Sequence, residues 1–106
     1  MSSLAFKVFK SYMSNKELRF TKHAKNVLVK RRLDEDEVLN AINSADEVFL
    51  DRRSGHMVAV KGNEPALVVV YDVIDNRFEI VTAFKTSKPV KLIRSRLNKA
   101  YWVRVR

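Results

Sequence analysis

The sequence has no cysteine among its 106 residues, and only two glycines and two prolines. Without cysteine the chain has neither disulfides nor thiolate metal sites, which fits a reducing compartment. The scarcity of glycine and proline leaves little room for linkers or long loops. No apolar run approaches the roughly 18 residues that span a bilayer, and Lys7 and Lys10 interrupt the stretch where a signal peptide is continuously apolar. We therefore expect one cytoplasmic domain over residues 1–106, with no membrane attachment.

Positive charge is what the sequence has in excess, with 21 Lys and Arg residues, 12 acidic residues and a net charge of +9. The charges are segregated along the chain. Residues 1–33 hold nine bases and one acid, residues 34–51 hold seven acids and no base, and residues 85–106 hold eight bases and no acid. Basic clusters attract phosphate backbones, although cations also serve simply to keep a small domain dissolved. We expect a nucleic acid as the main partner.

Apolar residues at helical spacing predict N-terminal helices over residues 3–13, 22–32 and 34–44. Thr21 stands at the N-cap position of the second helix, and Asp34 begins a capping-box pattern at the third. A fourth helix is expected after Pro89. Its buried side would carry Val90, Ile93, Leu97 and Tyr101, and its exposed basic row would carry Lys91, Arg94, Ser95 and Asn98.

Four β-type runs, separated by short turns, lie between the third and fourth helices, at residues 47–51, 56–61, 66–73 and 77–84. The third run is rich in β-branched residues and is expected to be central. In the fourth run, alternation places Phe78, Ile80, Thr82 and Phe84 on one face. The predicted fold class is α+β. N-terminal helices would pack on a four-stranded antiparallel meander, followed by a basic C-terminal helix.

Two histidines are the candidates for acid–base chemistry, because no P-loop, nucleophile elbow or zinc-protease motif is present. Helical spacing sets His23 in a row with Asn26 and Lys30. It is either a general acid or base or a helix histidine that only makes a hydrogen bond. His56 follows Arg52 and Arg53 and is either a phosphate contact or an ordinary turn residue. The histidines have no carboxylate at a metal-binding spacing, so neither a metal nor another cofactor is expected.

Three segments carry a family resemblance: Phe20-Thr21-Lys22-His23-Ala24, Lys30-Arg31, and Leu33 to Val38. They resemble the pattern F-[ST]-x-H-A-x-x-R-x-x-x-R-G-[IV]-[ST]-x-x-x-V of a domain-of-unknown-function family. Val81-Thr82-Ala83-Phe84 resembles the last strand of that family. The resemblance covers about residues 18–86. The family is grouped with the barnase–EndoU–colicin–RelE-like ribonuclease fold, in which many members are toxins that cleave RNA without metal.

By this resemblance, His23 takes the place of the family histidine, Arg31 that of its second arginine and Thr82 that of its last-strand threonine. Two positions depart from the pattern. Val27 stands where the family has its first arginine, and Arg32 replaces the glycine. The missing cation at Val27 is compatible with a rewired site or with an inactive one.

The sequence thus predicts a nucleic-acid-binding protein, for RNA rather than DNA, with metal-independent endoribonuclease activity of the toxin type as its candidate chemistry. The candidate catalytic residues are His23, Lys30, Arg31, Lys61 and Thr82. The candidate nucleic-acid-binding residues are Arg32, Arg52, Arg53, His56, Lys85, Lys88, Lys91 and Arg94. A toxin would have an acidic antitoxin over its basic face. A non-catalytic binding module, and a homodimer that pairs acidic and basic segments of two copies, are the alternatives.

Overall fold

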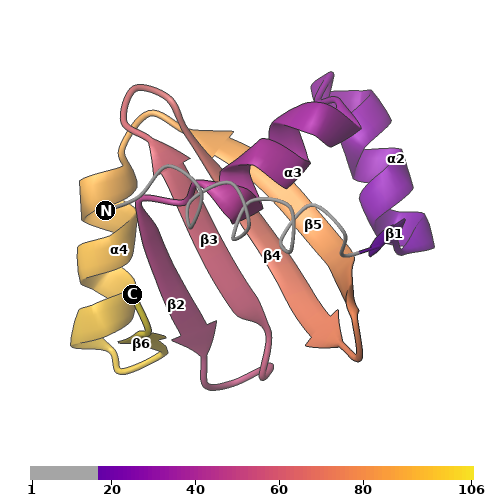
Figure 1. The fold of residues 1–106 in the computed structure, drawn as a ribbon. Helices are drawn as coiled ribbons and strands as arrows, with labels where there is room; N and C mark the ends of the chain where they lie inside the picture. Colours follow the sequence, from indigo (N-terminus) through magenta and orange to yellow (C-terminus); the bar gives the residue numbers. More distant parts are fainter. Residues whose placement is uncertain (1–16) are drawn as a thin grey trace, which may run out of the picture.

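The computed structural model describes residues 17–106 (Figure 1). The helix expected over residues 3–13 lies outside the described residues. Along the chain the elements are β1 (Glu17–Phe20), α2 (Lys22–Arg31), α3 (Glu35–Asn43), β2 (Glu47–Asp51), β3 (Met57–Gly62), β4 (Ala66–Ile74), β5 (Arg77–Thr86), α4 (Pro89–Asn98) and β6 (Trp102–Arg104). No helix among these residues is long and apolar enough to cross a membrane.

The sheet has six strands in the order β1-β5-β4-β3-β2-β6, with β1 parallel to β5 and the other pairs antiparallel. The predicted four-stranded antiparallel meander is therefore wrong. The prediction missed the two edge strands, which have four and three residues. Segments this short show little alternation, yet pairing with an open sheet edge satisfies their backbone groups.

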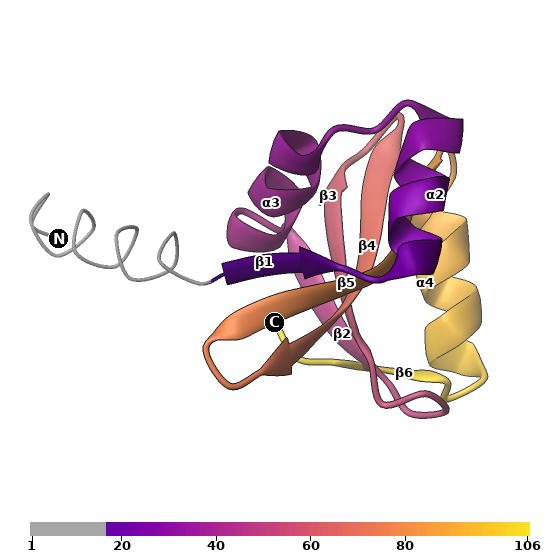
Figure 2. The same cartoon turned by 90° about the vertical axis from the view of Figure 1, so that its right-hand side faces the viewer.

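The helices lie on both sides of the sheet, and Figure 2 shows α3 and α4 on opposite faces. On one face, which we call the α3 face, α2 and α3 bury Ala59, Val69 and Ile80 together with their own apolar residues. On the other, the α4 face, Phe49, Val58 and Val68 pack with Ile93 and with the C-terminal segment. The expectation of N-terminal helices packed on one sheet face thus omitted the second layer formed by α4.

A β-bulge between β4 and β5 changes which residues share a face. Tyr71 pairs with Ile80, but Val70 pairs with Thr82, so the register shifts by one residue at Val81. An extra residue in one strand moves each following side chain of that strand to the opposite face of the sheet. Ile80 therefore lies on the α3 face, whereas Thr82, opposite Val70, lies on the α4 face with Phe84. The prediction that Phe78, Ile80, Thr82 and Phe84 share one face is wrong for this reason.

Helix ends follow the local sequence closely. The Thr21 side chain accepts a hydrogen bond from Ala24 N, and Asp34 forms a complete capping box with Glu37. In α4, Ile93 and Leu97 face the core as predicted. Val90 does not, being 60% exposed. Leu92 packs against the α4-face cluster instead, so the buried side of α4 is rotated from the predicted one.

The second half of β5 pairs with β4 on one side, and on its other side it lies along α2 rather than along β1. β1 pairs only with Arg77–Ile80. Beyond that point, Thr21 Oγ1 donates to Val81 O at 3.4 Å and Arg31 Nη1 donates to Ala83 O at 2.6 Å. An open sheet edge presents unpaired carbonyls that other chains can join. The two α2 side chains close this edge, which gives Arg31 a structural role.

Tyr71 should make the protein sensitive to alkali. Burial raises the pKa of the Tyr71 phenol above its ordinary value of 10.0, while the charge of Arg106 lowers it in part. The unfolded chain therefore loses this proton first. The contribution of the protonated Tyr71 phenol to the free energy of unfolding is intact below the unfolded-state pKa. It is lost as pH rises through the folded-state pKa. We expect Tyr71→Phe to flatten the fall in unfolding free energy between about pH 9 and 11, measured by urea denaturation. Equal slopes for the two proteins would contradict this.

Candidate nucleic-acid interface

The structure places His23 and Lys30 together on the outer side of α2. With Asn26, Val27 and Val29 they line a shallow pocket, as the predicted helical row requires. Val27 is buried. An arginine at this position would have to turn outward or find a buried partner, so valine there suits the packing of α2 against the sheet.

The other candidate catalytic residues come from the end of α2, from β3 and from β5. Arg31 is bonded to the backbone of β5, and Lys61 Nζ lies 3.7 Å from Asp46 Oδ1. Thr82 lies on the α4 face, across from Val70. Arg31 thus contacts the chain neighbour of Thr82 in β5, whereas Lys61 lies in β3 and is engaged by Asp46.

Three of the seven acids in residues 34–51 form ion pairs with cations of the same chain within residues 17–106. Besides the Lys61 pair, Lys85 Nζ lies 3.7 Å from Glu37 Oε2, and Arg104 Nη1 lies 2.8 Å from Glu47 Oε1. Exposed pairs of this kind contribute only about 0–1 kcal/mol each. Their larger effect is on the electrostatic potential at the surface. The carboxylates offset the charges of Lys61 and Lys85, which weakens the attraction of these two cations for a phosphate of a ligand.

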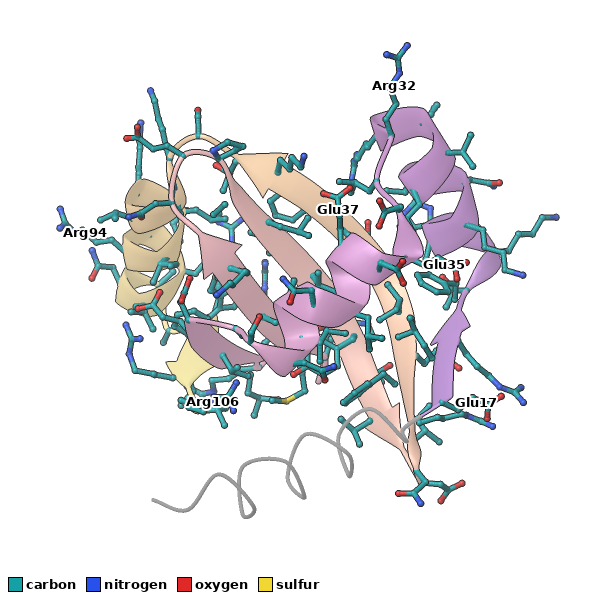
Figure 3. All side chains as sticks on the ribbon, turned by 45° about the horizontal axis from the view of Figure 1, so that its top comes forward. Glu17, Arg32, Glu35, Glu37, Arg94 and Arg106 are labelled. Carbon is teal, nitrogen blue, oxygen red and sulfur yellow. The ribbon has the colours of Figure 1, made fainter. Side chains whose placement is uncertain are left out.

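Cations on α4 have a different setting. Lys88, Lys91 and Arg94 line one side of a groove between α4 and the β3–β4 turn, which we call the α4 groove. Its neutral polar residues are Asn63, Ser87, Ser95 and Asn98, and its one carboxylate is Glu64. Within residues 17–106, no carboxylate forms an ion pair with Lys88, Lys91 or Arg94. Figure 3 shows Arg94 pointing away from the sheet into solvent.

The basic surface continues from the end of α4 to the β2–β3 turn. The guanidinium carbon of Arg53 lies 3.8 Å from the centroid of the Tyr101 ring, and Lys99 Nζ lies 5.9 Å from the same ring. Arg52 N donates to Tyr101 O at 2.8 Å. These contacts fix the turn, with Arg52 and Arg53, against the C-terminal end of α4.

Arg32 lies apart from this surface. It follows α2 in the left-handed conformation, with φ 54°. Figure 3 shows Arg32 at the far end of α2, well separated from Arg94. The acidic first turn of α3, with Glu35 and Glu37, comes directly after it. The predicted binding residues thus divide between two surfaces, and carboxylates adjoin the one on α2.

A His–Asp pair lies where the β2–β3 turn enters β3. His56 Nδ1 lies 2.7 Å from Asp72 Oδ1, with side chains 31% and 28% exposed. Met57 pairs with Tyr71, so the ladder sets His56 opposite Asp72. The turn is held by hydrogen bonds from Asp51 N to His56 O and from Gly55 N to Asp51 O, and Gly55 has a φ of +80° that favours glycine.

Asp72 is the residue that sequence reasoning missed. Thr82, predicted as a catalytic residue, lies on the same sheet face as Asp72. No atom within residues 17–106 is bonded to His56 Nε2. The pair therefore offers one ring nitrogen to an incoming group.

Metal-binding clusters were sought among the His, Cys, Asp and Glu side chains of residues 17–106, and no group of three or more is present. Comparisons of the chain with protein-family models, with curated proteins and with solved structures return no match, so the ribonuclease-family resemblance stays a prediction from its motif residues.

Proposed function

We propose that the protein binds single-stranded RNA along the α4 groove. The observation that carries this is the row of Lys88, Lys91 and Arg94, whose charges no carboxylate of residues 17–106 offsets by an ion pair. Residues three apart on a helix share one side. Such a row follows a phosphate backbone, and the release of bound counterions drives the binding.

The Arg53–Tyr101 stack supports a single-stranded ligand. Unpaired bases stack on aromatic rings and on arginine guanidinium planes. Arg53 is exposed, and its guanidinium carbon lies 3.8 Å from the centre of the Tyr101 ring. Its outer surface can take a base while Lys99 and the α4 groove hold the adjoining phosphates. In a duplex the bases stack on one another inside the helix, so they are not available to stack on the Arg53 guanidinium.

The α2 surface is the weaker candidate for this function. It also carries many cations, but α3 follows it with Asp34, Glu35, Asp36 and Glu37. Figure 3 shows Glu35 and Glu37 on the side of α3 nearer to α2. Like charges of a phosphate backbone and these carboxylates repel each other across short distances.

Removing three charges from the groove should weaken RNA binding and its salt dependence. In Lys88→Gln/Lys91→Gln/Arg94→Gln, we expect the slope of log affinity against log salt to fall by about 2, at roughly 0.7 per phosphate contact. Affinity near 0.1 M salt should fall about 10- to 100-fold for the same reason. Fluorescence anisotropy with a labelled single-stranded RNA, from about 50 to 200 mM salt, measures both.

The matched control removes the same charge from α2, as Lys22→Gln/Lys25→Gln/Lys30→Gln. This variant should bind with nearly the slope of the unmodified protein. Equal losses in the two variants would mean that only net charge matters, and a larger loss in the α2 variant would move the interface to the His23 surface. DNA of the same sequence in a parallel titration tests the preference for RNA.

We place this activity in the cytoplasm, which the cysteine-free composition fits. An acidic protein partner would occupy the same groove by the same charge attraction, and would compete with RNA. A homodimer that uses the acidic segment is less favoured, because Glu37, Asp46 and Glu47 already form ion pairs with Lys85, Lys61 and Arg104.

A further inference from the structure

His56 and Asp72 have the arrangement of a base and its orienting carboxylate. With Nδ1 donating its proton to Asp72 Oδ1, the imidazole keeps Nε2 as an acceptor. At 31% and 28% exposure the pair is open to a ligand but shielded enough to keep its geometry. It lies on the α4 face, beyond the apolar residues that α4 covers.

The pair also adjoins the basic surface. His56 and Arg53 belong to one compact turn, and that turn is bonded to the end of α4 through Arg52 and Tyr101. Charged residues on the adjoining elements include Asp51 at the end of β2, Arg52 and Arg53 in the turn, Asp72 in β4, Glu79 in β5 and Lys99 after α4. A strand held in the α4 groove and stacked on Arg53 would therefore bring a phosphodiester to His56.

We propose that His56 is the catalytic base of an RNA-cleaving centre, with Asp72 as its positioning residue. This inference rests on the RNA binding proposed above. RNA, unlike DNA, carries its own nucleophile beside each phosphate, so a correctly placed base is enough to start cleavage.

The reaction needs no redox partner. Nε2 of His56 takes the proton of the ribose 2′-OH, and the 2′ oxygen forms a bond to the adjacent phosphorus. The bond from phosphorus to the 5′ oxygen breaks, its electron pair stays on that oxygen, and water supplies the proton that the oxygen then takes. The hydroxide left from that water takes the proton from Nε2 of His56, which restores the base. The products are a 2′,3′-cyclic phosphate and a 5′-OH end. The turn before His56 supplies two guanidinium groups, those of Arg52 and Arg53, that would offset the charge on the phosphoryl oxygens.

The experiment incubates single-stranded RNA with the unmodified protein, His56→Ala and His56→Gln, all in EDTA. The unmodified protein should yield 2′,3′-cyclic phosphate ends, and DNA of the same sequence should stay intact. Removing a general base should lower the cleavage rate about 10²–10⁴-fold in both variants, with RNA affinity unchanged. Added imidazole should restore part of the rate in His56→Ala, which no structural role of His56 would allow.

His23→Ala is the matched control, and its cleavage rate should equal that of the unmodified protein. RNA binding without cleavage by the unmodified protein would overturn this inference and leave the proposed function standing. Absence of binding at low salt would overturn both. Three other outcomes would each show that His56 is not the catalytic base. They are full cleavage by His56→Gln, loss of cleavage in His23→Ala, and cleavage by the unmodified protein that stops in EDTA. His56→Gln also covers the case in which His56→Ala does not fold.

Discussion

Replacing Asp72 with Asn should lower the turnover of RNA about 10²–10⁴-fold while leaving KM nearly unchanged. The substitution keeps the size of the side chain but adds an amide donor. Turned toward Nδ1, that amide holds the imidazole proton on Nε2, and the nitrogen that must accept the 2′-OH proton is then blocked. The measurement is steady-state cleavage of a labelled single-stranded RNA.

Two further measurements separate positioning from mere stabilisation. Asp72→Asn removes a negative charge near the RNA path, so its affinity for RNA should be equal or slightly higher. Its midpoint of urea unfolding should change little, because a half-exposed pair contributes little to stability. A variant that unfolds easily but cleaves normally when folded would instead assign the His56–Asp72 pair to stability alone.

The sequence predicts the local structure of this protein well, because its signals act over a few residues. Thr21 and the Asp34 capping box stand at the starts of α2 and α3, as expected, and the central strand β4 is buried on both faces. The fold as a whole was predicted wrongly because edge pairing depends on distant partners. β1 is bonded to a strand about 60 residues away in the chain, and no local pattern in Glu17–Phe20 reports that.

The facing of Thr82 was predicted wrongly for a similar reason. Alternation along β5 assumes an unbroken register, and the bulge at Val81 moves Thr82 to the α4 face. A family motif identifies residues, but it does not show where a β-bulge reverses the sheet face to which the following side chains point. The motif threonine therefore lies on the sheet face that also carries Asp72, and not on the face that carries Ile80.

The His56–Asp72 pair was within reach of sequence reasoning. The turn of residues 62–65 predicts a hairpin, and its ladder pairs Gly62 with Ala66. Counting outward from Glu64 between them, His56 and Asp72 are each eight positions away, so they face each other across the two strands. A prediction for His56 that rests only on its neighbours in the chain misses this cross-strand partner.

Phe49→Ala should destabilise the protein by about 3–5 kcal/mol, the usual cost of deleting a large buried ring. Phe49 is fully buried in β2, and its ring centroid lies 5.1 Å from that of Trp102 in β6. On the same face it packs in one cluster with Ile93 of α4. The cavity would therefore open where the edge strand, the sheet and α4 meet. Urea unfolding followed by circular dichroism measures the loss.

The same substitution tests whether RNA binding depends on the docking of α4. The groove cations are held in a row only while α4 lies on the sheet, so RNA affinity should fall with the population of folded protein as urea is added. Val29→Ala is the control, because Val29 is 81% exposed and its loss should change stability by less than about 0.5 kcal/mol. A Phe49→Ala protein as stable as the control would mean that β6 and α4 do not depend on this cluster. RNA affinity that persists after unfolding would instead assign binding to charge alone.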